Sequence, residues 1–348
     1  MEKSLCSLMK QYTYIDNVFL FEGCISLRQN DDWIQPVRIN DDKKILYPYI
    51  SEFQAPHWKS IVSEQCSGVR LCFATDSENI IMELAEVFEG MQIDLYVNEQ
   101  YKDSVVLSEN ETEVKFTNID SGFNKITIWL DQRFSFKLKS IWLDKGARIN
   151  KTLNYSKIWV HYGSSISHSR EAGSPSNTWT SLVSRKLQLN LTNLGYAANC
   201  ALEPMVGRMI RDLPADFITM KLGINVHAGH LSRRTFLPNA IGLVSLIREK
   251  HPSTPIVIIS PIYSSPREDI RKWEFGLTLG DMRKILEEVV ERFRQQGDKN
   301  IYYVDGLNIF GQKEAEYLPD QLHPNAQGQF ALADNFIREV FQNLKLIV

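Results

Sequence analysis

The stretch KIWVHYGSS, residues 157–165, is a short apolar run that stops at Gly-Ser-Ser. A run of this length that ends at a glycine predicts a strand buried on both faces. Four similar runs follow it, over residues 190–195, 216–223, 255–263 and 301–306. Apolar residues at helical spacing occupy residues 178–189, 203–213, 236–251, 279–297 and 326–344. Strands that alternate with helices predict an α/β fold, in which helices cover both faces of a parallel sheet.

The preceding residues, 15–148, have a different pattern. Short runs rich in β-branched and aromatic residues are separated by polar turn clusters, and they occupy residues 69–75, 91–97, 124–130 and 136–143. Strands at this spacing, with no helical pattern between them, predict a β-sandwich or jelly roll.

Charge also divides the chain into two parts. Residues 1–150 hold 16 Lys and Arg against 23 Asp and Glu, whereas the remainder holds 23 against 19. Such an asymmetry supports two units. We therefore expect a jelly-roll-like β-sandwich domain over residues 1–148 and an α/β domain over residues 149–348, with the linker at 146–156.

Composition excludes several classes of protein. The chain has 348 residues, of which 43% are hydrophobic, and a formal net charge of −3. It is too apolar to be disordered, and it has no basic excess that would attract nucleic acid. No apolar run reaches the roughly 18 residues of a membrane span, and the N-terminus lacks a signal-peptide core. The five cysteines form no Cys-x-x-Cys pair, so we expect buried reduced thiols and a cytoplasmic protein.

Polar clusters follow the apolar runs at the points where the expected strands end. In an open parallel sheet, ligands bind beyond the carboxyl ends of the strands. Three clusters lie at such ends, and a fourth lies just before the last helix. They are Gly163–Ser165, Asn193–Gly195, Gly223–Asn225 and Asp320–His323.

These clusters contain the residue types of a nucleophilic reaction centre. The Ser165 hydroxyl needs a base to remove its proton, and His323 can be that base. Asp320, three residues earlier, can hold the other ring nitrogen of His323. The negative oxygen of a tetrahedral intermediate needs hydrogen-bond donors. The backbone N–H groups of Ser165 and Gly195 and the side-chain amide of Asn225 can supply them.

The four clusters resemble the four sequence blocks of the SGNH, or GDSL, hydrolase superfamily. The resemblance covers about residues 157–340, and Asp320 and His323 match the Asp-x-x-His block. It implies a flavodoxin-like three-layer α/β/α domain. It also implies ester chemistry with Ser165 as the nucleophile, His323 as the base and Asp320 as its orienting group, with no metal or cofactor.

Two positions depart from the family pattern. Ser164 replaces the usual Asp, and Val226 stands where many members carry Asp. Neither position is the nucleophile or the base. The strand-rich N-terminal part resembles the layout of carbohydrate esterases and of some antibiotic-pathway acyltransferases.

Each candidate residue also has a simpler interpretation. Ser165 can be only a helix cap, and Asp305, at the end of another strand, can orient His323 in place of Asp320. The spacing of His227 and His230 can hold a metal, but no third ligand lies nearby in the sequence. Buried packing is the expected role of Cys200.

Aromatic residues give two further expectations. The long connection over residues 264–281 can act as a binding loop, with Trp273 and Phe275 on an acyl group or sugar or packed on the surface. His227 can line the pocket mouth beside Trp273. Aromatic residues of the N-terminal half can stack on sugars but are expected to fill the sandwich core. They are Trp33, His57, Trp58 and Trp142.

The sequence thus predicts a serine ester hydrolase that acts through an acyl-enzyme. The resemblance suggests a short, acetyl-like acyl group on a carbohydrate or another small polar alcohol. An acyltransferase with the same Ser165, His323 and Asp320 is the first alternative. A glycan-binding protein on an inactive hydrolase scaffold is the second. The acyl chain, the alcohol and the oligomeric state stay open.

Overall fold

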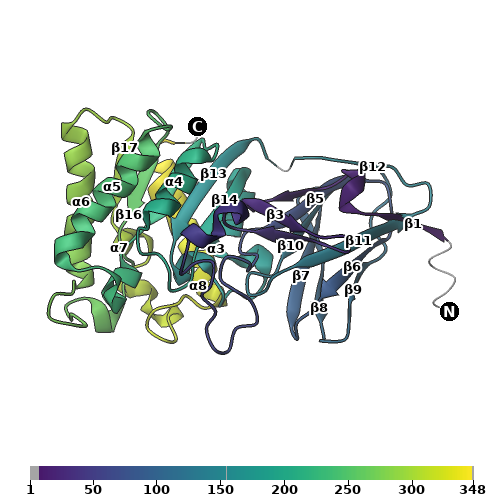
Figure 1. The fold of residues 1–348 in the computed structure, drawn as a ribbon, viewed down its shortest axis with the longest axis horizontal. Helices are drawn as coiled ribbons and strands as arrows, with labels where there is room; N and C mark the ends of the chain where they lie inside the picture. The colour runs from purple at the N-terminus through teal and green to yellow at the C-terminus, as the bar shows by residue number, and fades with distance from the viewer. Residues whose placement is uncertain (1–7, 154, 347–348) are drawn as a thin grey trace. The chain divides into compact units, whose positions relative to one another are not determined.

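The computed structural model describes residues 8–153 and 155–346, and Figure 1 shows its fold. The chain forms two compact units. One comprises Met1–Lys44, Ser51–Ser156 and Ser174–Ser176, and the other comprises Ile45–Ile50, Lys157–Gly173 and Asn177–Val348. The domain boundary expected at residues 148/149 stays a prediction.

The first unit is a sandwich of two antiparallel six-stranded sheets. One sheet has the order β3 (Ser26–Gln29), β4 (Ile34–Val37), β11 (Lys137–Asp144), β6 (Ile80–Glu86) and β9 (Glu113–Phe116), with β1 (Met9–Tyr12) also paired to β11. The other has the order β12 (Ile149–Asn150), β5 (Arg70–Thr75), β10 (Asn124–Leu130), β7 (Met91–Val97) and β8 (Gln100–Leu107), with β2 (Leu20–Glu22) also paired to β5. The predicted all-β sandwich is confirmed.

Aliphatic and phenylalanine side chains, not the expected tryptophans, fill the core of this sandwich. Trp142 is half-buried, whereas its neighbours Ile141 and Leu143 are buried. Successive side chains of a strand point to opposite faces, so the period of β11 turns Trp142 away from the core. Trp33 and Trp58 are half-buried as well, and His57 is exposed, so the expectation that these four residues fill the core is wrong.

The second unit contains a five-stranded parallel sheet. Its order is β14 (Leu189–Gly195), β13 (Lys157–Gly163), β15 (Phe217–Lys221), β16 (Ile256–Ile259) and β17 (Ile301–Val304). This is the strand order of a flavodoxin-like doubly wound sheet. Each strand matches an apolar run predicted from the sequence.

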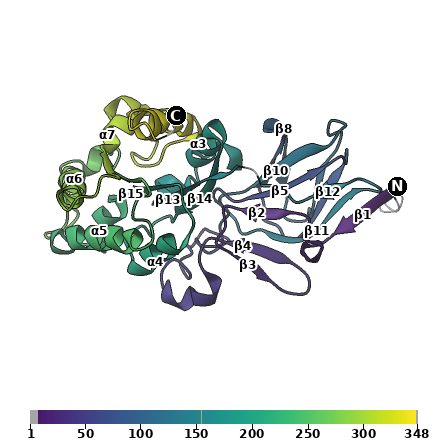
Figure 2. The same cartoon turned by 90° about the horizontal axis from the view of Figure 1, so that it is seen from above.

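Helices cover both faces of this sheet (Figure 2). On one face lie α4 (Pro204–Asp212) and α5 (Arg233–Arg248), and α6 (Leu279–Gln295) packs beside α5. On the other lie α3 (Trp179–Leu187) and α8 (Ala326–Phe336), which continues as η8 (Ile337–Gln342). The predicted three-layer α/β/α domain is confirmed. No helix of the described residues is long and apolar enough to cross a membrane.

Shorter helices occupy the connections. Two are α-helical, α2 (Ser165–His168) and α7 (Gly306–Ile309), and η5 (Val226–His230) is a π-type turn. The remaining short turns are η2 (Tyr14–Asp16), η3 (Asp41–Leu46), η4 (Pro175–Asn177), η6 (Ser265–Arg267) and η7 (Gln312–Tyr317).

Two glycines let α2 lie directly against the ends of β13 and β14. Gly163 and Gly195 are paired in register across these strands. A Cβ atom added to Gly163 would lie 2.2 Å from Ser167 Oγ, and one added to Gly195 would lie 2.5 Å from the backbone N of His168. The fold therefore requires glycine at both positions to bring Ser165 to the edge of the sheet.

Gly195→Ala is expected to destabilise the protein by about 1–3 kcal/mol, because the new methyl group meets the backbone of α2. Gly242→Ala is the matched control, since a Cβ added at this position of α5 meets no atom within 4 Å. That control should stabilise the protein by about 0.5–1 kcal/mol through helix propensity. Denaturant unfolding checks both, and equal effects of the two substitutions would contradict the close approach at Gly195.

Candidate active site

Ser165 begins α2 directly after β13. Ser164 is extended and caps this helix, with its Oγ accepting from the N–H of Ile166 at 3.4 Å. The residue that departs from the family pattern therefore serves as the cap. Ser165 is partly exposed between the buried Ser164 and Ile166. The interpretation of Ser165 as only a helix cap does not fit this arrangement.

A chain of hydrogen bonds connects Ser165 to His323 and Asp320. Ser165 Oγ lies 2.7 Å from His323 Nε2, and His323 Nδ1 lies 2.6 Å from Asp320 Oδ2. The other oxygen of Asp320 accepts from the backbone N–H of His323 at 2.7 Å and of Leu322 at 3.0 Å. An anionic carboxylate beside Nδ1 favours the tautomer that carries its proton there, which leaves Nε2 to accept a proton from Ser165.

Electrostatics keep Asp320 ionised. Partial burial acts to raise the pKa of Asp320, but hydrogen bonds from the backbone and ring of His323 outweigh it, so the pKa lies below its ordinary value. A carboxylate that stays charged at neutral pH can stabilise the imidazolium that forms when His323 accepts a proton.

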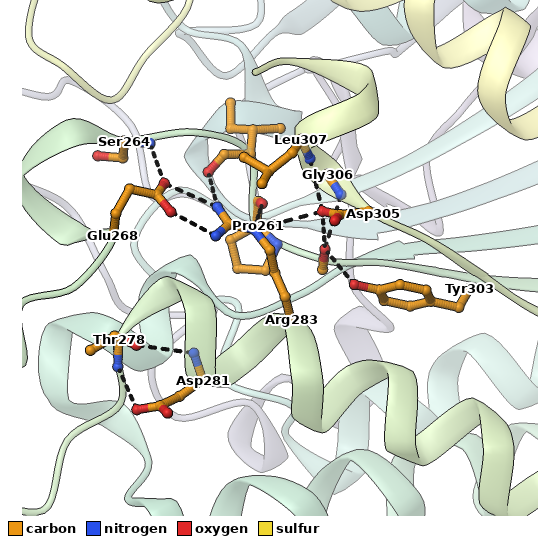
Figure 3. A network of polar contacts seen from close by, with 12 residues as sticks. Pro261, Ser264, Glu268, Thr278, Asp281, Arg283, Tyr303, Asp305, Gly306 and Leu307 are labelled. Atoms are coloured by element: carbon orange, nitrogen blue, oxygen red, sulfur yellow. Dashed lines mark hydrogen bonds and ion pairs between the residues drawn. The ribbon is translucent and has the colours of Figure 1, made fainter. Parts of the chain in front are cut away.

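Asp305, the alternative orienting group, has other partners. Its Oδ1 accepts from the N–H of Leu307 at 3.0 Å and from the Ser260 hydroxyl at 3.3 Å, and it lies 3.7 Å from Arg283 Nε. Figure 3 shows the contacts of Asp305 with Leu307 and Arg283. Asp305 thus caps α7, and Asp320 is the carboxylate that contacts His323.

Asn225 is held in an orientation that suits a hydrogen-bond donor. Its Oδ1 accepts from the backbone N–H of Cys200 at 3.0 Å, and the residue is 9% exposed. The side-chain Nδ2 group finds no acceptor among the described residues, so it is available to a bound oxygen atom.

Gly195, the second expected backbone donor, already has a partner inside the protein. Its N–H donates to Asn193 Oδ1 at 2.9 Å. A bound oxygen atom would share this donor with Asn193, and the role of Gly195 in the oxyanion hole stays a prediction.

His227 connects the loop after Asn225 to the long connection that precedes α6. Its Nε2 lies 2.9 Å from the carbonyl oxygen of Ile270, and the residue is 8% exposed. Trp273 is 38% exposed, and its ring nitrogen would lie 3.8 Å from a Cβ added at Gly229. His227 thus positions this loop, and its role in binding substrate stays a prediction. No group of three or more metal-ligating side chains occurs among the described residues.

The same connection also holds the loop that carries His323. Ser264 Oγ donates to the carbonyl oxygen of Gln321 at 2.7 Å, and Arg267 donates to that oxygen at 3.4 Å. Gln321, between Asp320 and His323, has a left-handed backbone with φ of 61°. A non-glycine residue is strained in this region, so the two donors help to keep the loop of His323 in place.

A partly buried ion pair holds Ser264 in turn (Figure 3). Its N–H donates to Glu268 Oε1 at 2.9 Å, and Glu268 accepts two hydrogen bonds from Arg283 on α6, at 2.6 and 3.0 Å. Arg283 also donates to the carbonyl of Pro261 at 3.1 Å. This network, which reasoning from sequence missed, joins α6 to the His323 loop.

A second buried network connects α2 to the parallel sheet. His161 Nε2 lies 2.7 Å from Ser167 Oγ, and His161 Nδ1 lies 2.7 Å from Thr219 Oγ1, which accepts from the indole N–H of Trp159. Burial, with the charge of Lys221, lowers the pKa of His161 to about 3. This imidazole therefore stays neutral and has a structural role.

Two other buried groups are weak candidates for catalysis. Burial raises the pKa of the Cys200 thiol far above its ordinary value, which suits packing and not a nucleophile. Lys221, at the end of β15, is 2% exposed, and burial lowers its pKa to about 7. Its ammonium group has no acceptor among the described residues.

The sequence profile of the GDSL-like lipase/acylhydrolase family matches residues 156–341, which contain all four clusters. The chain belongs to this family, and it is an SGNH-type esterase or acyltransferase.

Solved structures with the same fold span both units. A salicylyl-acyltransferase from a tetracycline biosynthetic pathway, SsfX3, is 31% identical over 98% of each chain, with a TM-score of 0.88. A protein from Bacteroides ovatus, described as a GDSL-like lipase, is 20% identical over 97% of this chain and 98% of its own, with a TM-score of 0.75. A family two carbohydrate esterase from Cellvibrio japonicus is 14% identical over 97% and 98%, with a TM-score of 0.67. No curated protein matches the sequence.

Ser264→Ala is expected to slow labelling of Ser165 by a fluorophosphonate probe by about ten-fold, because the strained Gln321 loses its strongest restraint and His323 shifts. Gln321→Gly added to this variant should restore much of the rate, since glycine adopts a φ near 61° without strain. Ser245→Ala, which removes an exposed hydroxyl of α5, is the matched control. An unchanged labelling rate in Ser264→Ala would show that Gln321 needs no such restraint.

Lys221→Met is expected to stabilise the protein most at or below pH 7. The unfolded chain keeps the lysine proton up to a pKa of about 10.4, whereas the folded chain loses it near pH 7. Between these values the unfolded state binds one more proton, so the stability of the wild type rises relative to the variant by about 1.4 kcal/mol per pH unit. The advantage of the variant therefore shrinks from pH 7 to pH 10.

Chemical denaturation at pH 7, 8 and 9 measures this difference. Lys284→Met, at an exposed position of α6, is the control and should show no such pH dependence. A difference between the wild type and Lys221→Met that stays constant over this range would refute the low pKa of Lys221.

Proposed function

We propose that this protein is a serine ester hydrolase in which Ser165 is acylated during the reaction. The hydrogen-bond chain Ser165–His323–Asp320, with spacings of 2.7 and 2.6 Å, is the observation that carries the proposal. The three groups lie in the order nucleophile, base and orienting carboxylate, which is the arrangement that activates a serine hydroxyl.

The first half of the reaction acylates the serine. Ser165 Oγ attacks the carbonyl carbon of the ester, and its proton moves to His323 Nε2. The carbonyl oxygen becomes negative and accepts hydrogen bonds from the N–H groups of Ser165 and Gly195 and from Asn225 Nδ2. When the intermediate collapses, the bond to the alcohol oxygen breaks, and the alcohol leaves with the proton from His323.

The second half releases the acid. Water gives a proton to His323 Nε2 and attacks the carbonyl carbon of acyl-Ser165. The second tetrahedral intermediate uses the same three donors, and its collapse returns the proton to Ser165 Oγ. Loss of one such donor typically costs about 2.7–4 kcal/mol of transition-state stabilisation, so Asn225 carries a substantial share of the rate.

The proposed substrate is an ester of a short acyl group with a carbohydrate or another small polar alcohol, and neither nucleic acid nor a metal takes part. The proposed compartment is the cytoplasm, as expected from the sequence. This compartment agrees with the free thiols of the described cysteines, which are Cys24, Cys66, Cys72 and Cys200.

Acyl transfer is the second candidate function. The 31% identity with the salicylyl-acyltransferase extends over 98% of both chains and so includes both units. Transfer needs the same Ser165, His323 and Asp320, and it differs only in that an acceptor alcohol or amine replaces water in the second half-reaction. A site that excludes water would favour it.

Ser165→Ala and His323→Ala are each expected to lower kcat for a short-chain aryl ester by about 10⁴-fold or more, because nucleophile and base act as one unit. Ser181→Ala, a buried hydroxyl on α3, is a control for a serine lost inside the same domain. Product analysis with added alcohols and amines separates hydrolysis, which gives free acid, from transfer, which gives a new ester or amide. Full activity in Ser165→Ala would refute both functions, whereas no activity in the wild type would favour a binding role.

A further inference from the structure

A surface cavity lies between the start of α5 and the connection that precedes α6. Its volume is about 650 Å³, which is within the usual range for small-molecule sites. The lining residues are Ser232, Arg233, Arg234, Arg271, Trp273, Glu274, Phe275 and Gly276. No residue of this set belongs to the hydrogen-bond chain of Ser165.

The segments that line the cavity adjoin the loops of the candidate active site along the chain. One wall, Ser232–Arg234, follows η5, which begins directly after Asn225. The other wall starts at Arg271, next to the Ile270 carbonyl that contacts His227. The backbone N–H of Arg233 donates to the carbonyl of Phe275 at 3.1 Å and joins the two walls. A ligand in this cavity therefore lies against the loop that follows Asn225.

Exposed aromatic rings dominate one side of the cavity. Trp273 and Phe275 are 38% and 62% exposed, and their rings meet edge to face with centroids 5.9 Å apart. Ile270, just before this pair, is 61% exposed. Large apolar side chains gathered on one surface loop mark a binding site more often than chance exposure, because their contact with water is unfavourable. Flat rings of this kind pack against a flat apolar ligand.

Positive charge surrounds these rings. Arg233, Arg234 and Arg271 line the cavity together with one carboxylate, Glu274. A second carboxylate, Asp281, lies 3.5 Å from both Arg233 and Arg271. Three cations thus face two carboxylates, which leaves an excess of one positive charge.

Arg234 is the cation best placed to serve a ligand. Its guanidinium has no ion pair or hydrogen bond among the described residues, whereas Arg233 and Arg271 share Asp281. A guanidinium group binds a carboxylate or phosphate through two parallel hydrogen bonds. An uncharged acyl chain would use the aromatic side of the cavity and leave Arg234 without a partner.

We propose that this cavity binds an aromatic anion, a flat apolar ring that bears a carboxylate or phosphate group, as part of the ester substrate. The ring packs on Trp273 and Phe275, and the anionic group pairs with Arg234 and Arg233. The assignment to the substrate rests on the proposed function. The binding site itself does not, because binding can be measured in a protein whose nucleophile is absent.

Calorimetric titration of the Ser165→Ala protein with 2-naphthoate tests the site, and 2-naphthamide is the uncharged analogue. We expect naphthoate to bind about ten-fold tighter than the amide at low salt, and to weaken as salt screens the charges. Arg234→Gln should remove that preference, whereas Trp273→Leu should weaken both ligands. Arg292→Gln, which removes an exposed arginine of α6 paired with Glu288, should change neither.

Equal affinities for the acid and the amide would overturn the proposal. So would naphthoate binding that both Arg234→Gln and Trp273→Leu leave unchanged, since the ligand would then occupy another place. Thermal unfolding of each variant guards against misfolding. Phe275→Ala, at a mostly exposed side chain, replaces Trp273→Leu if that variant does not fold.

Hydrolysis by the wild type then tells which half of the ester occupies the cavity. 4-Acetoxybenzoate carries the anion in its alcohol half, and phenyl acetate is its uncharged counterpart. Phenyl 4-carboxybenzoate carries the anion in its acyl half, and phenyl benzoate is its uncharged counterpart. A preference for the anion in one pair, lost in Arg234→Gln, supports the proposal. Turnover of neutral esters without any such preference refutes the role in substrate binding. No turnover at all refutes the proposed function and leaves the titration to decide the site.

Discussion

The hydrogen bond between Ser165 Oγ and His323 Nε2 joins residues 158 positions apart. Its formation therefore depends on how most of the second unit folds. The parallel register of β13 and β14 sets Gly163 opposite Gly195, and their lack of side chains lets α2 approach the sheet edge. From the other end of the chain, Asp320 holds the ring of His323. Under the proposed mechanism, a shift of about 1 Å on either side would cost much of the rate, since reacting groups must be held in near-attack geometry.

Buried polar groups that take no direct part in the reaction keep this geometry. His161 connects Ser167 on α2 to Thr219 on the central strand, and the neutral form of its ring suits a fully buried site. Arg283 and Glu268 do the same for the loop of His323 through Ser264. A buried polar group is costly unless paired, so each of these partners is needed for both stability and position.

The connection over residues 264–276 combines three tasks in one segment. Its first part restrains Gln321, its middle contacts His227, and its last part carries Trp273 and Phe275 at the surface cavity. One loop therefore links the position of His323, the proposed base, to the cavity proposed to bind the substrate. Substitutions along it are expected to change more than one kinetic parameter, which agrees with the general role of long connections in binding.

The sequence by itself determined the strands and the chemical groups. Apolar runs of strand length, each followed by a helical pattern, specify a parallel sheet, and the positions of Ser165, Asp320 and His323 indicate the catalytic groups. Only the tertiary structure decided how these groups are held. Ser264 Oγ donates to the carbonyl oxygen of Gln321, and Asn225 Oδ1 accepts from the N–H of Cys200. Contacts such as these, and the placement of Arg234 and Trp273 in one cavity, depend on loops distant in sequence, which no local pattern encodes.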